Sequence, residues 1–328
     1  MSESSAERAK QASNEPKYHH YVPQFYLSRW ANNERKICRF SKPYDRIVPK
    51  MVGLKRTGGQ EKLYELKSVA PEHSQWVEKG PMWEMDTYGS QALELLEAGE
   101  IAGMTKQERS NWSRFLMSMM MRGPYDIELI RKSYADEWQK NVPEIIEKLQ
   151  VSDNEITRGL ADKVPEMLAA DGPLMADWAL EMAVGMMDHT GMGGLLNKLI
   201  WMVRDVPEGV PELLTSDRPI MASDTMVLHD DYILMPIGPR KLFLGVTTPE
   251  TEYRVKQYNI ATQVTAVNRF IVGQAQEQVY GTDDAQLDFV REHMSQRSRP
   301  SLFERLARFR ELNPNPKKNE RCYFSKTG

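Results

Sequence analysis

The sequence predicts an α+β fold in which a helical block packs with strands from the N-terminal segment and from a C-terminal sheet region. Three observations predict it. Residues 18–80 hold short runs of two-residue period, 81–190 hold apolar residues at helical spacing, and 195–280 hold short apolar runs bounded by turn residues. With 328 residues the chain exceeds the usual size of one core, so one large or two closely packed domains are expected. We predict one compact domain over 18–312.

The opening part is predicted to be rich in strands. Residues 1–17 are small, polar and charged, so we expect a disordered tail. The stretch from His19 to Trp30 follows, and Pro23 fixes its backbone. We expect it to carry polar groups into the body of the fold. Strands are expected at 35–40, 46–51 and 62–66, with a turn at 42–45.

The central part is predicted to be helical. A helix is expected over 83–96, and Thr105 and Glu108 have the spacing of a capping box. The apolar residues behind that box recur at one helical face, and Arg122-Gly123-Pro124 is expected to end the helix. A further helix follows Pro124, and the last of this block is expected over 174–189, ending at Gly191.

After Gly194 the pattern favours strands again. They are expected at 199–203, 212–215, 220–222, 233–237 and 241–246, with a hairpin turn at 207–209 between the first two. A helix is expected at 250–267, a strand at 269–280, closing helices at 284–294 and 302–312, and a basic tail at 313–328.

Charge is distributed unevenly along the chain, although the net charge is only −3. Residues 1–60 hold 12 Lys and Arg against 5 Asp and Glu, and residues 291–328 hold 10 against 4. The segment between them holds 21 against 37. Basic ends around an acidic centre fit either a face that binds a polyanion or solvated termini on an acidic body.

Several classes of protein are excluded or disfavoured by the sequence. No apolar run reaches the length of a membrane span, and no secretory signal pattern opens the chain. Two cysteines far apart fit a reducing compartment, so we expect a cytoplasmic protein. The phosphate-cradling, dinucleotide-binding and nucleophile-elbow motifs are missing, and we expect no cofactor. His229-Asp230-Asp231 is expected to be a surface loop, because adjacent extended residues point in opposite directions; no metal is expected.

Two polar stretches stand out: His20-Tyr-Val-Pro-Gln-Phe-Tyr-Leu-x-Arg, and Thr215-Ser216-Asp217-Arg218-Pro219. On these stretches, and on Arg122-Gly123-Pro124, the chain resembles a family of mainly bacterial proteins, domain of unknown function 4238. The resemblance spans His20 to about Tyr280. Trp30 stands where the family usually has Phe, and Arg218 where it usually has Asn. The family name implies no activity.

The residues themselves suggest a chemistry. His20, Ser216, Asp217 and Arg122 brought together would supply a proton shuttle, a hydrogen-bonding carboxylate and an anion clamp, with Arg29, Glu84 and Arg218 as substrate-binding residues. That set suits a hydrolase or nuclease acting on a phosphodiester. The structural alternative is that His20 donates to a buried carbonyl, Asp217 caps a turn and Arg122 pairs with Glu84.

A second function, from another class, is a non-catalytic module that recognises nucleic acid or a protein partner through its basic faces. Polyanion binding weakens steeply as salt rises, which separates it from recognition that is insensitive to salt. The sequence leaves both functions open, and it does not fix the oligomeric state.

Overall fold

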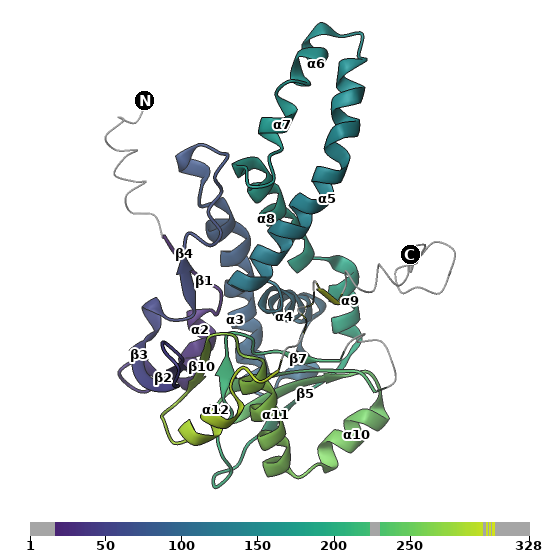
Figure 1. The fold of residues 1–328 in the computed structure, drawn as a ribbon. Coiled ribbons are helices and arrows are strands. Elements are labelled where there is room, and N and C mark those ends of the chain that lie inside the picture. Colours follow the sequence, from purple (N-terminus) through teal and green to yellow (C-terminus); the bar gives the residue numbers. More distant parts are fainter. Residues whose placement is uncertain (1–16, 224–229, 298–299, 301, 303, 306–328) are drawn as a thin grey trace, which may run out of the picture. The chain divides into compact units, whose positions relative to one another are not determined.

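The computed structural model describes residues 17–223 and 230–297, together with 300, 302, 304 and 305. Its backbone forms two compact units, each assembled from separate stretches of the chain. Of the described residues, the first unit holds 17–19, 60–84 and 124–187; the second holds 20–59, 85–123 and those from 188 onward. The elements follow one another as labelled in Figure 1, and helices and antiparallel strands together give the predicted α+β class.

The first unit is mainly helical. Its helices are α5 (Pro124–Gln150), α6 (Glu155–Leu160), α7 (Val164–Met167) and α8 (Pro173–Met187). Trp138 on α5 faces Trp178 on α8, with ring centroids 5.7 Å apart, above a buried cluster that contains Val142 and Met175. The short strands β1 (Tyr18–His20) and β4 (Gly59–Glu61) pair with each other. A boundary between the units falls in each strand, since His20 and Gly59 belong to the second unit and the other residues to the first.

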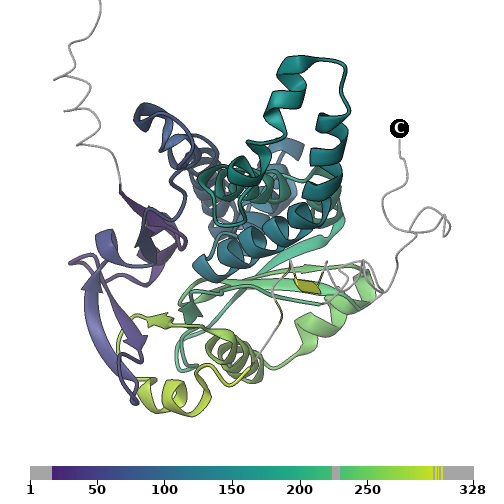
Figure 2. The ribbon, with the colours of Figure 1, turned by 45° about the horizontal axis from the view of Figure 1, so that its top comes forward.

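The second unit contains two four-stranded antiparallel sheets. The larger, which has more residues in its strands, has the order β5-β9-β8-β7. Its strands are β5 at Ile200–Asp205, β9 at Lys241–Val246, β8 at Tyr232–Gly238 and β7 at Met221–Ala222. Helix α11 (Ile260–Gln274) covers one face, seen from another side in Figure 2, and buries Val264 and Ile271 against Leu242 and Leu244. On the other face Phe243 meets Trp112 of α4 (Lys106–Met119), so both faces of the central strands are buried.

The smaller sheet has the order β3-β2-β10-β6, with β3 at Val48–Gly53, β2 at Lys36–Ser41, β10 at Gln278–Gly281 and β6 at Thr215–Ser216. Cys38 and Phe40 of β2 pack with Val279 of β10 and with Val290 of α12 (Leu287–His293). The remaining helices are α2 (Gln24–Leu27), α3 (Trp83–Glu97), α9 (Thr190–Lys198) and α10 (Pro249–Gln257).

Several predicted elements are confirmed. The capping box at the start of α4 is complete: Thr105 N–H donates to the Glu108 carboxylate at 2.7 Å, and Glu108 N–H donates to the Thr105 hydroxyl at 3.2 Å. The strands predicted at 35–40 and 46–51 are β2 and β3, and they pair through the predicted turn.

Other predictions were wrong, and side-chain caps explain two of them. Residues 190–198 continue as α9, because the His189 ring accepts from Met192 N–H and caps a new helix despite its glycines. The helix expected over 250–267 is two helices, since Asn259 caps α11 through Thr262 N–H at 3.1 Å. The strand expected from 269 begins only at Gln278, because the apolar run before it belongs to α11.

Two errors concern strand pairing. The segment 62–66 forms turns, and its expected strand lies earlier, at β4. Residues 207–209 do not close a hairpin, because β5 pairs with β9 whereas β6 pairs with β10 in the other sheet. The segments 1–16, 224–229 and 306–328 lie outside the described residues, and with them nearly all of the predicted N-terminal tail, His229, the basic tail and most of the last predicted helix. Within the described part of the chain, every helix is too short or too polar to cross a membrane.

Candidate functional site

Two aromatic residues of the opening stretch, which runs from His19 to Trp30, pack within the second unit. The Tyr26 hydroxyl donates to the Pro236 carbonyl at 2.8 Å and lies 2.6 Å from the Thr215 hydroxyl, so it contacts both sheets. Burial raises the pKa of Tyr26 far above its usual value, which keeps the phenol neutral. Trp30 is fully buried, and its indole N–H donates to the Leu213 carbonyl at 2.7 Å. The polar atoms of both rings therefore serve the fold.

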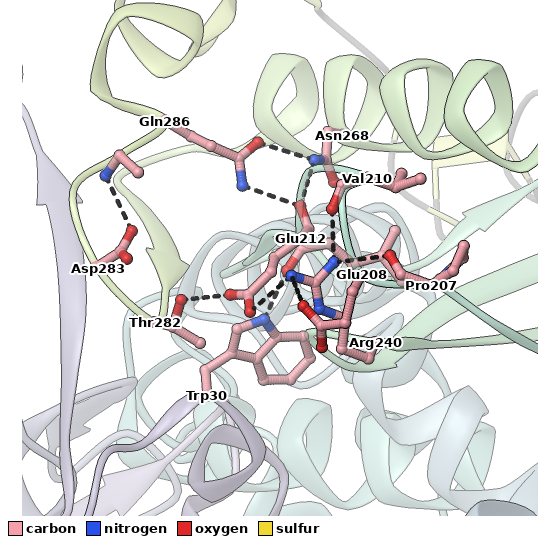
Figure 3. A network of polar contacts seen from close by, with 12 residues as sticks. Trp30, Pro207, Glu208, Val210, Glu212, Arg240, Asn268, Thr282, Asp283 and Gln286 are labelled. Carbon is pink, nitrogen blue, oxygen red and sulfur yellow. Dashed lines mark hydrogen bonds and ion pairs between the residues drawn. The ribbon is translucent and has the colours of Figure 1, made fainter.

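A polar network fixes the segment on which Trp30 docks (Figure 3). The Glu212 carbonyl accepts from the side-chain amides of Asn268, at 2.8 Å, and Gln286, at 2.9 Å. The Glu212 carboxylate accepts from the Thr282 hydroxyl and lies 3.3 Å from the Arg240 guanidinium. Because backbone and side chain of Glu212 are both held, this network positions a connecting segment between the sheets.

His20 and Arg122 lie in one cluster with Asp86. Arg122 is only 1% exposed, and its guanidinium donates to Asp86 Oδ1 at 2.6 Å and to the His20 carbonyl at 2.7 Å. Burial lowers the pKa of His20; a hydrogen bond with the backbone of Lys55 and the charge of Asp86 act in the opposite direction. The ring is therefore neutral at pH 7.

The predicted partner of Arg122 was wrong. Asp86, rather than Glu84, provides the carboxylate, and Glu84 is exposed on α3. Residues two apart on a helix point about 200° apart, so the two carboxylates cannot serve the same neighbour. The structure gives no support for Glu84 as a binding residue beside Arg122.

The turn at 216–218 forms a second, separate group of contacts. The Asp217 carboxylate accepts from the backbone N–H groups of Gln276, Glu277 and Gln278 at 2.9, 2.6 and 3.0 Å. Ser216 Oγ accepts from Arg218 N–H at 3.1 Å. Burial raises the pKa of Asp217 to about 6, although the three N–H donors favour its charged form.

The seven predicted site residues are thus distributed over several places. His20 and Arg122 come together, whereas Asp217 is bound to the loop before β10. Arg29 forms a two-pronged ion pair with Glu97, at 2.9 and 3.0 Å, and also donates to the Phe25 carbonyl. The side chains of Asp217, Arg122 and Arg29 each hold backbone or a partner side chain in place, as the structural alternative expected for Asp217.

Sequence reasoning missed His19. The ring is fully buried; its Nδ1 accepts from Tyr64 N–H at 2.9 Å, so the proton lies on Nε2, which donates to Gln75 at 2.7 Å. The ring also stacks on Tyr64, with centroids 5.6 Å apart. A signal was available: adjacent residues of an extended backbone point to opposite sides, so the side chains of His19 and His20 must have different neighbours.

The basic N-terminal region is concentrated in one hairpin. We call residues 35–56 the basic hairpin: it comprises β2, β3, their turn and the short helix Leu54–Arg56. It contains eight basic residues and one acidic residue, Asp45; the basic residues are Arg35, Lys36, Arg39, Lys42, Arg46, Lys50, Lys55 and Arg56. All of the basic residues except the half-buried Arg39 are exposed.

Two further features of the basic hairpin bear on function. Arg39 of β2 lies directly opposite Lys50 of β3 in the antiparallel register, so both side chains leave the same face of the sheet. Tyr44, in the turn, is 82% exposed. The hairpin therefore combines like charges with an uncovered aromatic ring.

Clusters that could bind a metal were also sought. No group of three or more His, Cys, Asp and Glu side chains is arranged to hold an ion anywhere in the described ranges. Asp230, the described neighbour of His229, pairs with Arg254.

Comparison with known proteins gives a family and no activity. No curated protein and no solved structure matches the chain. The family model "Protein of unknown function (DUF4238)" matches residues 18–285, which include the opening stretch, Arg122 and the turn at 216–218. The match covers most of the 328 residues and confirms the resemblance. The chain therefore belongs to the DUF4238 family.

Proposed function

We propose that this chain is a cytoplasmic, non-catalytic binding protein that recognises a polyanion, of the nucleic-acid class, through the basic hairpin. The observation that carries the proposal is the concentration of eight Lys and Arg residues against one Asp within residues 35–56. Phosphate contacts from such side chains supply most of the affinity of non-specific nucleic-acid binding. The rest of the chain carries a net negative charge, so the hairpin is the favoured binding surface for a polyanion.

The pair formed by Arg39 and Lys50 adds a specific argument. Like charges on directly opposed residues of two strands destabilise the pairing. A protein keeps such a local conflict where function requires it. A phosphate bound between the two side chains would remove the repulsion, so the pair favours an anionic ligand.

A purely structural explanation covers only part of this charge. β3 is an edge strand, and exposed lysines on an edge strand discourage pairing with another chain. That accounts for Lys50. It does not account for Arg39, because β2 lies between β3 and β10 and has no open edge.

The contacts of the predicted catalytic residue Asp217 and of the predicted substrate-binding residue Arg29 also favour binding over catalysis. Asp217 accepts three backbone N–H groups, and Arg29 is paired with Glu97 on both prongs of its guanidinium. Side chains with these structural duties are poorly placed to act on a substrate together with His20.

The test is binding of a fluorescently labelled 20-nucleotide probe, followed by anisotropy at several salt concentrations. We expect log K to fall linearly with log salt, as counterion release requires. The double variant Lys42→Glu with Arg46→Glu should weaken binding at least tenfold. The double variant Lys106→Glu with Lys132→Glu, at exposed positions of α4 and α5, makes the same change of charge outside the hairpin and is the matched control. Binding that ignores salt, or that both variants weaken equally, would refute the proposal.

A second candidate function is phosphodiester hydrolysis at the cluster of His20, Asp86 and Arg122. The observation in its favour is the lowered pKa of His20, because a neutral imidazole can take the proton of a water that attacks phosphorus. A fluorescent oligonucleotide that reports cleavage tests it. Turnover that His20→Ala abolishes, with probe binding retained, would support hydrolysis, and no turnover under any condition would remove this candidate.

A further inference from the structure

We infer that the basic hairpin binds single-stranded nucleic acid, and that Tyr44 is the platform on which an unpaired base stacks. The inference rests on the proposed function and names the class of nucleic acid for the same surface. It starts from the position of Tyr44, which lies in the turn between β2 and β3 and is 82% exposed. Pro43 precedes it and fixes part of the turn backbone.

The neighbours of Tyr44 distinguish it from an ordinary exposed aromatic residue. Lys42 and Arg46 stand two residues before and after it, and all three side chains are exposed. An aromatic ring between basic side chains is the combination that single-strand binding proteins use, with charges for the phosphates and a ring for the base. The ring face contributes affinity for any base, so the site needs no fixed sequence.

The geometry favours a single strand over a duplex. A base can stack on a side chain only when its own face is open, and in a duplex both faces are covered by neighbouring base pairs. The basic residues continue from the turn along β3 to Lys50 and then to Lys55 and Arg56. Six residues of β-strand extend about 20 Å, which gives an extended strand several phosphate contacts beyond the stacked base.

The experiment compares three probes of equal length: a 12-nucleotide single strand, the duplex of the same sequence, and an abasic single strand that keeps the phosphates but lacks the bases. Each is titrated with the wild-type chain, Tyr44→Ala and Tyr44→Phe. We expect Tyr44→Ala to weaken binding of the single strand by about tenfold and Tyr44→Phe to keep it, because phenylalanine retains the ring. Binding of the abasic strand should be the same for all three proteins.

The outcomes separate this inference from the proposed function. If the single strand binds equally well to Tyr44→Ala, or if the duplex binds more tightly than the single strand, the stacking inference is overturned while polyanion binding stands. If none of the probes binds in a salt-dependent way, the proposed function fails and the inference fails with it. Circular dichroism of each variant, expected to match the wild type because Tyr44 is exposed, shows that lost binding is not lost folding.

Discussion

Trp30 uses its ring and its indole N–H together. The ring lies edge-on to Tyr26, with centroids 5.2 Å apart, and the N–H satisfies the carbonyl of Leu213. A phenylalanine at this position would fill much of the space but could not donate. The indole thus supplies a hydrogen bond that holds the Leu213 segment to the opening stretch.

We therefore expect Trp30→Phe to lower the free energy of unfolding by about 1–3 kcal/mol, because a buried carbonyl loses its donor and some ring volume is lost. Urea denaturation measures the change. Trp83→Phe is the matched control, since Trp83 is 58% exposed and the same substitution there should cost under about 0.5 kcal/mol. Equal effects at the two positions would show that the Leu213 contact contributes nothing.

Asp217 should titrate far from the range of an ordinary aspartate. Burial raises its pKa from 3.8 to about 6, so the folded protein takes up a proton there between pH 7 and 5. Because the folded-state pKa is the higher one, the stability that this group contributes is complete below pH 3.8 and is lost as the pH rises through about 6. Side-chain carboxyl carbon shifts measured by NMR give the midpoint, and Asp217→Asn identifies the signal. A midpoint near 4 would show that the three N–H donors outweigh burial.

At the residue scale the sequence identified important positions better than it identified their partners. His20, Arg122 and Asp217 all make structural contacts, yet Arg122 pairs with Asp86 rather than Glu84. A partner depends on the helix phase and on the packing of distant segments, neither of which motif spacing reveals. His19 was missed for the same reason, since its partners Tyr64 and Gln75 are 45 and 56 residues away.

At the element scale, α8 contributes a clamp for a loop within the first unit. The buried Asp177 carboxylate accepts from Lys67 N–H and Ser68 N–H at 2.8 and 2.7 Å, and from the Ser68 hydroxyl at 2.6 Å. A single side chain on a helix thus satisfies two backbone donors of an irregular segment, where no strand or helix could pair them.

We expect Asp177→Ala to cost about 2–4 kcal/mol, since it leaves these donors without their acceptor, and Asp177→Asn to cost less because one oxygen remains. Hydrogen exchange of the Lys67 and Ser68 amides measures the loss of local stability, and urea denaturation measures the loss of global stability. Unchanged exchange in Asp177→Ala would contradict the clamp.

Elements with strong local signals were predictable from the sequence. The capping box of α4 and the alternation in β2 are examples. Elements that depend on distant contacts were not. The apolar residues before Gln278 read equally well as a buried strand, and only their burial against the larger sheet makes them part of α11. Likewise, the partner strands of β5 and β6 lie far along the chain, so the nearby turn at 207–209 was misleading.

At the scale of the whole molecule, neither unit is continuous in sequence. The predicted blocks at 18–80, 81–190 and 195–280 follow local composition, whereas the first unit takes residues 60–84 and 124–187 and leaves those between them to the second. The prediction of one compact domain over 18–312 stays a prediction. The opening stretch illustrates the interleaving, because His19 belongs to the first unit and His20 to the second.

The distribution of charge is the other property of the whole molecule. In the basic hairpin we expect the same charges to strengthen the binding of a polyanion and to lower the free energy of unfolding. Lys50→Glu converts the repulsive pair with Arg39 into an attractive one, so we expect the free energy of unfolding to rise by about 0.5–1 kcal/mol. The same change removes one phosphate contact and introduces a repulsive charge, so binding of a single strand should weaken at least fivefold. The magnitude of its salt slope should fall by about 0.7, the value for one lost contact.

Urea denaturation and probe anisotropy on the same preparation measure both quantities. Lys50→Ala is the intermediate control: it should relieve the repulsion without a new attraction, and should weaken binding less than Lys50→Glu does. If Lys50→Glu raises the free energy of unfolding and weakens binding of the probe, Lys50 contributes to ligand binding although it destabilises the fold. If Lys50→Glu instead destabilises the protein and leaves binding unchanged, the lysine serves the edge strand alone, and the polyanion surface must exclude β3.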